Sequence, residues 1–137
     1  MADRRRVSVW AFAVVLAACA ARAPGPQPIA WDREPCTGCH MIIGERGFAA
    51  QVLDADGRAR SFDDPGCLFT WLDKGGQARE IWLHHLHEDR WLRAPAVAFV
   101  RGQRSPMGSG LGAVDPGTAG AVSYADARRA LGAGGAP

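Results

Sequence analysis

The sequence predicts a single α+β domain, and three segments carry this prediction. Residues 48–62 contain two alternating apolar runs around a turn, which indicates a β-hairpin. From Leu68 onward, apolar residues recur at spacings of three and four, which indicates an amphipathic helix. A second helix is predicted over 123–131. The length of 137 residues suits one domain with a hydrophobic core better than two.

The first predicted unit runs strand, strand, helix, strand. The hairpin turns at residues 54–57, whose sequence Asp-Ala-Asp-Gly is a common turn signal. Asp64 suits the N-cap of the helix, and Pro65 suits its first helical position. Gly75-Gly76 marks the end of this helix, and the apolar run 81–86 is expected to form the third strand.

The second predicted unit is less regular than the first. Strands are expected over 96–100 and 111–114, and Ser123 is placed to cap the helix at 123–131. No closing strand is evident after this helix, so the second unit is expected to be incomplete or arranged differently. Residues 132–137 are expected to form a flexible tail.

The N-terminus has the pattern of an export signal. Arginines at 4–6 precede an apolar run over 7–16, which is too short to span a bilayer as a mature helix. The run ends Leu-Ala-Ala-Cys at Cys19, which resembles a bacterial lipobox. This resemblance implies removal of residues 1–18 and lipidation of Cys19. The alternative is an ordinary signal peptide in which Cys19 has no role.

The expected consequence is a membrane-anchored domain facing the periplasm. The proline-containing residues 19–32 would form the anchor and tether, and 33–131 the folded domain. The whole chain has 16 basic and 14 acidic residues, but residues 1–18 hold three arginines and one aspartate. The remaining chain is therefore neutral, which gives no electrostatic reason to expect nucleic acid as a partner.

Residues 36–41, with the sequence Cys-Thr-Gly-Cys-His-Met, concentrate four soft or borderline metal donors. Thiol, thioether and imidazole ligands favour a Cu(I) site over a site for hard cations. Pro35 and Gly38 suit a tight turn that brings the two thiols together. On an extended segment, Cys39 and Met41 would then share one face.

Other interpretations of the same residues stay open. Cys36, Cys39 and His40 match the attachment motif of a c-type haem, for which Met107 is an available distal ligand. Small c-type cytochromes are mainly helical, whereas residues 47–62 indicate a hairpin. A C-x-x-C pair is also found in redox-active sites and as half of a zinc site. The sequence around this pair lacks the strand–helix context of a thioredoxin-like oxidoreductase.

A structural disulfide is the simplest alternative. The oxidising compartment that an exported protein enters favours disulfides. If Cys19 carries lipid, three thiols are left for pairing, namely Cys36, Cys39 and Cys67. An odd number leaves at least one thiol unpaired within the monomer.

Three motifs in order resemble the NosL family, the copper-binding accessory lipoproteins of nitrous-oxide reductase assembly. They are the C-x-x-C-x-M stretch at 36–41, Phe-Asp-Asp-Pro-Gly-Cys-Leu at 62–68, and Ser-Pro-Met-Gly-Ser-Gly-Leu at 105–111. The likeness covers residues 33–131. It implies two related units of two strands, a helix and a strand. It also implies a periplasm-facing Cu(I) carrier, not an enzyme, with copper donor and acceptor proteins of the periplasm or the membrane assembly machinery as partners.

The resemblance also implies a ligand set for Cu(I). Cys39 and Met41 match the family's cysteine and methionine, and Met107 matches the methionine of its Pro-Met-Gly loop. Cys36 matches a thiol that only some members carry. His40 departs from the family pattern. The expected metal ligands are therefore Cys39, Met41, Met107 and Cys36.

The acidic and thiol residues around the predicted helix start are expected to be structural. Cys67 lies in the first turn, where the helix dipole favours a thiolate, but Leu68 and Trp71 favour packing in the core. Asp63 and Asp64 are interpreted as capping residues rather than catalytic carboxylates.

His84, His85 and His87 offer imidazoles for a second copper site. On a strand, His85 and His87 would share a face that His84 does not. Histidines at the end of a strand are more often solvated, and this simpler interpretation is favoured.

Overall fold

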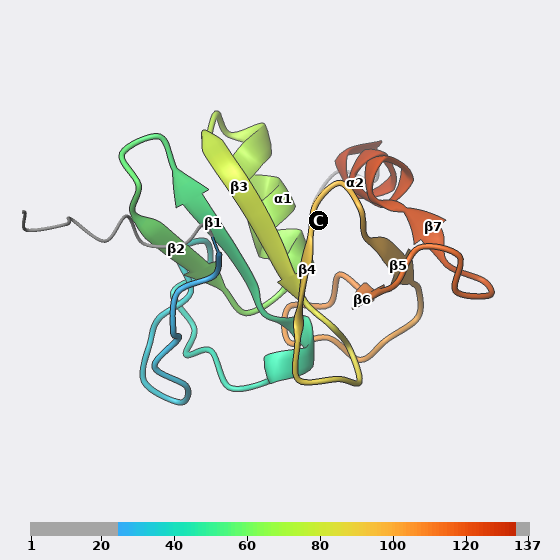
Figure 1. The fold of residues 1–137 in the computed structure, drawn as a ribbon, viewed down its shortest axis with the longest axis horizontal. Helices are drawn as coiled ribbons and strands as arrows, with labels where there is room; N and C mark the ends of the chain where they lie inside the picture. Colours follow the sequence, from blue (N-terminus) through green and yellow to red (C-terminus); the bar gives the residue numbers. More distant parts are fainter. Residues whose placement is uncertain (1–24, 134–137) are drawn as a thin grey trace, which may run out of the picture.

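The computed structural model describes residues 25–133, which form two antiparallel sheets and two helices (Figure 1). This confirms the predicted α+β class. The predicted export signal and Cys19 lie outside the described residues. The elements in order are η1 (Arg46–Phe48), β1 (Ala50–Asp54), β2 (Ala59–Phe62), α1 (Pro65–Asp73), β3 (Ala78–His84), β4 (Trp91–Arg93), β5 (Ala98–Val100), β6 (Gly112–Val114), β7 (Val122–Ser123) and α2 (Tyr124–Ala133).

The first sheet has the strand order β2-β1-β3-β4 and is built on the predicted hairpin. Asp54 Oδ1 accepts hydrogen bonds from the backbone N–H groups of Asp56 and Arg58, and Gly57 adopts a φ of 77° that favours glycine. The predicted order of strand, strand, helix and strand is confirmed for β1, β2, α1 and β3. The edge strand β4, which pairs with β3, was not predicted.

The second sheet has the order β6-β5-β7, and α2 follows directly from β7. The strands predicted at 96–100 and 111–114 are confirmed as β5 and β6. Ser123 caps α2, because its Oγ accepts a hydrogen bond of 3.1 Å from Asp126 N. Within residues 25–133 no strand follows this helix, and the strand that was not predicted, β7, precedes it. The helix continues to Ala133, so the expected tail does not begin at residue 132.

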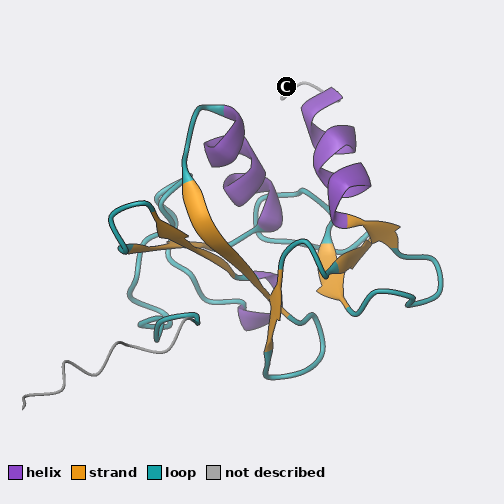
Figure 2. Ribbon diagram, turned by 45° about the horizontal axis from the view of Figure 1, so that its top comes forward, coloured by secondary structure: helices purple, strands orange, loops and turns teal. Residues whose placement is uncertain are grey.

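The two helices lie side by side on the same side of the sheets (Figure 2). Phe69 of α1 joins the halves of the domain, because its ring packs against Phe99 of β5 and Tyr124 of α2 at centroid distances of 5.8 and 5.4 Å. An ion pair between Arg128 and Asp73 joins the two helices directly. The N-terminus of α1 also contacts the second half of the domain, because Asp64 at the helix start accepts a hydrogen bond from Met107 N at 2.9 Å.

The expected tether boundary at residue 32 is wrong for the described part of that segment. Gln51 on β1 donates from Nε2 to the carbonyl of Gln27 at 3.1 Å, and Ile29 is buried in the core. Trp31 packs under the guanidinium of Arg46. The folded domain therefore includes residues from Gln27 onward. No helix among residues 25–133 is both long and apolar enough to cross a bilayer.

Candidate metal centre

Three thiols and one carboxylate converge beside the N-terminus of α1. The ligand atoms of Cys36, Cys39, Asp63 and Cys67 all lie within 4.8 Å of one another. The first two come from the turn that precedes β1, and the other two come from the junction between β2 and α1. Cys36 and Asp63 are buried, whereas Cys39 and Cys67 are partly exposed.

Backbone hydrogen bonds hold the thiol-bearing turn in place. Cys36 N donates to Met41 O at 2.8 Å, and His40 N donates to Cys36 O at 3.0 Å, so the chain turns back on itself. Thr37 N donates to Ser61 O at 2.8 Å, which ties the turn to the edge strand β2. Cys39 N points at the Cys36 sulfur from 3.5 Å, as expected for a turn that stabilises a thiolate.

Two glycines allow the segments around the site to approach one another. A Cβ on Gly38 would lie 3.1 Å from Cys67 Cβ, so the turn rests directly on the first turn of α1. A Cβ on Gly66 would lie 2.8 Å from Ser109 Cβ, so the loop at 105–110 rests on the same helix end. Larger residues at either position would push these segments apart.

Adjacent aspartates at the start of α1 have different roles. Asp64 caps the helix as predicted, because its Oδ1 accepts from Gly66 N at 2.7 Å. Its Oδ2 accepts from Met107 N at 2.9 Å, which holds the 105–110 loop over the helix. The capping role expected for Asp63 is wrong. Its buried Oδ1 accepts from the Cys39 thiol at 3.4 Å, which places the carboxylate in the thiol cluster.

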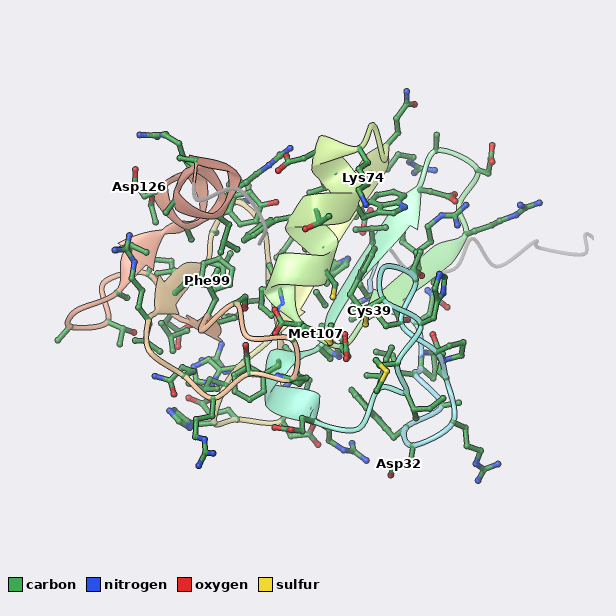
Figure 3. The ribbon with its side chains drawn as sticks, turned by 180° about the vertical axis from the view of Figure 1, so that it is seen from behind. Asp32, Cys39, Lys74, Phe99, Met107 and Asp126 are labelled. Carbon is green, nitrogen blue, oxygen red and sulfur yellow. The ribbon has the colours of Figure 1, made fainter. Side chains whose placement is uncertain are left out.

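A cavity of about 540 Å³ opens beside the thiols. Figure 3 shows Cys39 and Met107 near the N-terminal end of α1 and Lys74 at its other end. The cavity extends between these two ends of the helix. The residues that line it are Thr37, Gly38, Cys39, Gly66, Cys67, Thr70, Trp71, Lys74, Met107, Gly108, Ser109 and Leu131.

The four sequence-predicted ligands are distributed unequally around this centre. Cys36 and Cys39 lie together in the cluster, and Met107 lines the same cavity as Cys39. Met41 does not line the cavity, and 59% of its surface is exposed. The expected extended geometry is wrong, because His40 adopts a left-handed φ of 66° between Cys39 and Met41. The two sulfurs therefore do not share the face of a strand.

Hydrogen bonding leaves one thiolate in the cluster at neutral pH. The Cys67 thiol donates to Cys36 and, with nearby backbone N–H groups, lowers the pKa of Cys36 to about 4. The same bond is the main reason that the pKa of Cys67 is raised well above its usual range. Burial raises the pKa of Cys39 to about 11 and that of Asp63 to about 6. At neutral pH Cys36 is therefore the thiolate, whereas Cys39 and Cys67 keep their protons.

This donor set fits a thiophilic metal ion. Three sulfur ligands suit Cu(I), and three sulfurs with one carboxylate oxygen also satisfy the preferences of Zn²⁺. Hard cations such as Mg²⁺ and Ca²⁺ prefer oxygen ligands and do not fit. A c-type haem does not fit either. Only 1% of Cys36 is exposed, and its sulfur lies among Cys39, Cys67 and Asp63 rather than at a surface where a porphyrin would attach.

Sequence reasoning missed Cys67 and Asp63 as members of the cluster. Leu68 and Phe69 beside Cys67 are indeed buried, but Cys67 itself lines the cavity. Two signals in the sequence pointed to these residues. Only one of the two adjacent aspartates can be the N-cap, so the other needs a different role. Three thiols cannot all pair within the monomer, so a third thiol was available to join Cys36 and Cys39 in one site.

The hydrogen bonds of His85 do not favour the hypothesis of a second copper site at the histidines. His85 Nδ1 accepts hydrogen bonds from the backbone N–H groups of His87 and Glu88 at 3.2 and 3.1 Å. The ring proton therefore resides on Nε2, the atom that faces Glu88 and Asp115. Arg90 already forms ion pairs with both carboxylates. A metal ion there would have to displace a proton and compete with a guanidinium.

Comparison with known proteins identifies a solved structure with a similar fold. No family model and no curated protein sequence matches the chain. The structure is similar to the crystal structure of the copper chaperone NosL from Shewanella denitrificans, with a TM-score of 0.53. The two share 22% sequence identity, and the match covers 79% of this chain and 87% of that chain. The chain therefore has a NosL-like fold, as its three sequence motifs predicted.

Proposed function

We propose that this protein binds Cu(I) at the thiol cluster and carries it to another protein, as a metallochaperone rather than an enzyme. One observation carries the proposal: three thiols from two separate segments lie within 4.8 Å of one another, at the edge of an open cavity. Cu(I) is then cargo, and the cluster must hold it tightly while leaving it accessible. The motif resemblance and the NosL-like fold support the choice of copper.

The arrangement of the sulfurs suits this task. Cys36 is buried and already a thiolate at neutral pH, so it can anchor a monovalent cation without losing a proton. Cys39 and Cys67 border the cavity, and Met107 lines the same cavity with a weaker thioether donor. A ligand from a partner protein would approach Cu(I) through the cavity and bind before the chaperone thiols release it. Three-coordinate Cu(I) leaves room for such exchange.

The biological setting extends this proposal. Delivery of copper for the assembly of nitrous-oxide reductase, or of a similar copper protein, accounts for the likeness to NosL. A lipid on Cys19 would hold the domain at a membrane surface facing the periplasm, where donor and acceptor proteins of the assembly machinery would exchange copper with it.

Copper titration of the reduced protein tests the central claim. Under anaerobic conditions and in competition with a Cu(I) chelator, we expect one Cu(I) per chain and a near-ultraviolet thiolate-to-copper absorption band. The same titration with Zn²⁺ serves as the comparison, since the donor set also satisfies that ion. Reduced protein that leaves all the copper with a weak chelator would refute the proposal, and a haem Soret band in isolated protein would support the c-type haem alternative.

Proton release on copper binding is the second expected result. At pH 7, Cys36, with a pKa of about 4, is ionised, whereas Cys39, with a pKa of about 11, and Cys67 are protonated. Binding by all three sulfurs should therefore release about two protons, and the affinity should rise with pH because protons compete with the metal. Titration in a weakly buffered solution with a pH indicator measures this number. Release of about one proton would show that one of the two protonated thiols does not bind the metal.

A further inference from the structure

The cavity beside the thiols is far larger than a metal ion requires. Its volume of about 540 Å³ lies in the range of sites for small molecules and short peptides. One wall is a single face of α1, formed by Gly66, Cys67, Thr70, Trp71 and Lys74. The cavity is therefore a groove that begins at the thiol cluster and follows the helix to Lys74 at its C-terminal end. Figure 3 shows Cys39 and Lys74 at the two ends of this helix.

The facing walls of the groove come from three other segments. They are the turn at 37–39, the loop at 107–109, and Leu131 of α2. The side chains of Trp71, Met107 and Leu131 make much of the lining apolar, and none of the described lining residues is acidic. Lys74 is the one charged residue among them. The groove thus has soft metal ligands at one end and a cation at the other.

The ammonium group of Lys74 is free to bind an anion. Lys74 is exposed, and within residues 25–133 it forms no ion pair. Its neighbour Asp73 does not neutralise it, because the Asp73 carboxylate is paired with Arg128 at 2.8 Å. A lysine at the C-terminus of a helix also interacts favourably with the helix dipole, which is a purely structural reason for its presence.

We propose that this groove receives an extended, acidic segment of the copper-accepting protein. A soft donor of that segment would reach Cu(I) at Cys39 and Cys67, while a carboxylate side chain pairs with Lys74. The inference rests on the proposed function, since it assigns the partner of the same site. Charge complementarity at Lys74 selects an acidic segment over a basic or neutral one.

The geometry also sets the spacing of the two recognition elements. Cys67 and Lys74 are seven residues apart on the helix, which corresponds to about 10 Å at about 1.5 Å per residue. An extended peptide covers this distance in about three residues. The expected pattern in the partner is therefore a soft-donor residue followed or preceded, three positions away, by Asp or Glu.

Two synthetic peptides and one charge reversal test the groove. The peptides are acetylated and amidated Met-Gly-Gly-Glu and Met-Gly-Gly-Lys, which differ only in the charge at the fourth position. Binding to the reduced full chain is followed by amide resonance shifts, with and without Cu(I). We expect the acidic peptide to bind about threefold to tenfold more tightly, with shifts at Thr70, Trp71 and Met107. In Lys74→Glu the order of the two affinities should reverse, so that the peptide ending in lysine binds more tightly.

Controls separate recognition from stability and from copper binding. Arg58→Glu makes the same charge change in the hairpin turn, outside the groove, and should leave the peptide order unchanged. Lys74→Gln should remove the preference without reversing it. A Lys74 that served only the helix would change thermal stability but not peptide preference. Equal binding of both peptides in the parent and in Lys74→Glu, or shifts confined to residues outside the groove, would overturn the proposal. Because peptide binding is also measured without Cu(I), failure of the groove proposal can be told apart from failure of the protein to bind copper.

Discussion

Replacement of Cys39 or Cys67 by serine is expected to abolish tight Cu(I) binding. Each substitution removes one of three sulfur ligands and substitutes a hydroxyl that Cu(I) binds poorly. Mutations of outer residues around a metal typically cost about 10- to 100-fold in affinity, so the loss of a direct thiolate should exceed about 100-fold. Affinity is measured by competition with a Cu(I) chelator at fixed pH. Both residues are partly exposed, so the variants should remain folded.

Met41→Leu is the matched control for this prediction. Met41 is exposed and does not line the cavity, so its replacement should leave the affinity nearly unchanged. The sequence alone predicts the opposite: the family resemblance makes Met41 a ligand, and the neighbours Leu68 and Trp71 make Cys67 a core residue. If Met41→Leu weakens binding as much as Cys67→Ser does, the thiol cluster is not the copper site.

Asp64→Ala is expected to have the largest effect on stability. Asp64 is fully buried, and its two oxygens accept hydrogen bonds from Gly66 N and Met107 N. Alanine removes the helix cap and leaves two backbone donors without a partner. The expected loss is about 2–4 kcal/mol in the free energy of unfolding, from the cap and the unsatisfied groups together. Chemical denaturation of the metal-free protein measures it.

Ser123→Ala provides the comparison, because Ser123 caps α2 at the exposed surface and both of its side-chain hydrogen bonds go to Asp126 in the same helix, so it connects α2 to no other segment. Its expected cost is about 1 kcal/mol. The Asp64 variant should also lose Cu(I) affinity if its Met107 contact positions the loop, whereas Ser123→Ala should not. Equal stability losses in the two variants would show that the bond from Asp64 to Met107 contributes nothing.

Local sequence signals predicted those parts of the fold that local interactions determine. The hairpin of β1 and β2 follows from its turn residues and alternating pattern, and α1 follows from Asp64 and Pro65 at its start. The strands β4 and β7 have only three and two residues. Neither is long enough to show a period, and each exists because a neighbouring strand offers free backbone groups.

The thiol cluster shows more clearly which contacts local sequence signals cannot predict. Cys36 and Cys39 are close in sequence, so their proximity was predictable from the turn between them. The contribution of Cys67 depends on how the turn rests on α1, which Gly38 permits through a contact far away in the sequence. Asp63 was missed because the acidic pair before proline was attributed wholly to capping, although only Asp64 can be the N-cap. In both cases a local explanation concealed a tertiary contact.

The convergence of the ligands on the junction between the two units has a consequence for turnover of the protein. Cu(I) held by Cys36, Cys39 and Cys67 would cross-link two segments that separate when the chain unfolds, and it would add to the unfolding free energy by mass action. If the protein carries copper as proposed, its copper-free form would then be the more easily digested one. Protease resistance would in that case report cellular copper supply, and a copper-starved cell would degrade the copper-free form first.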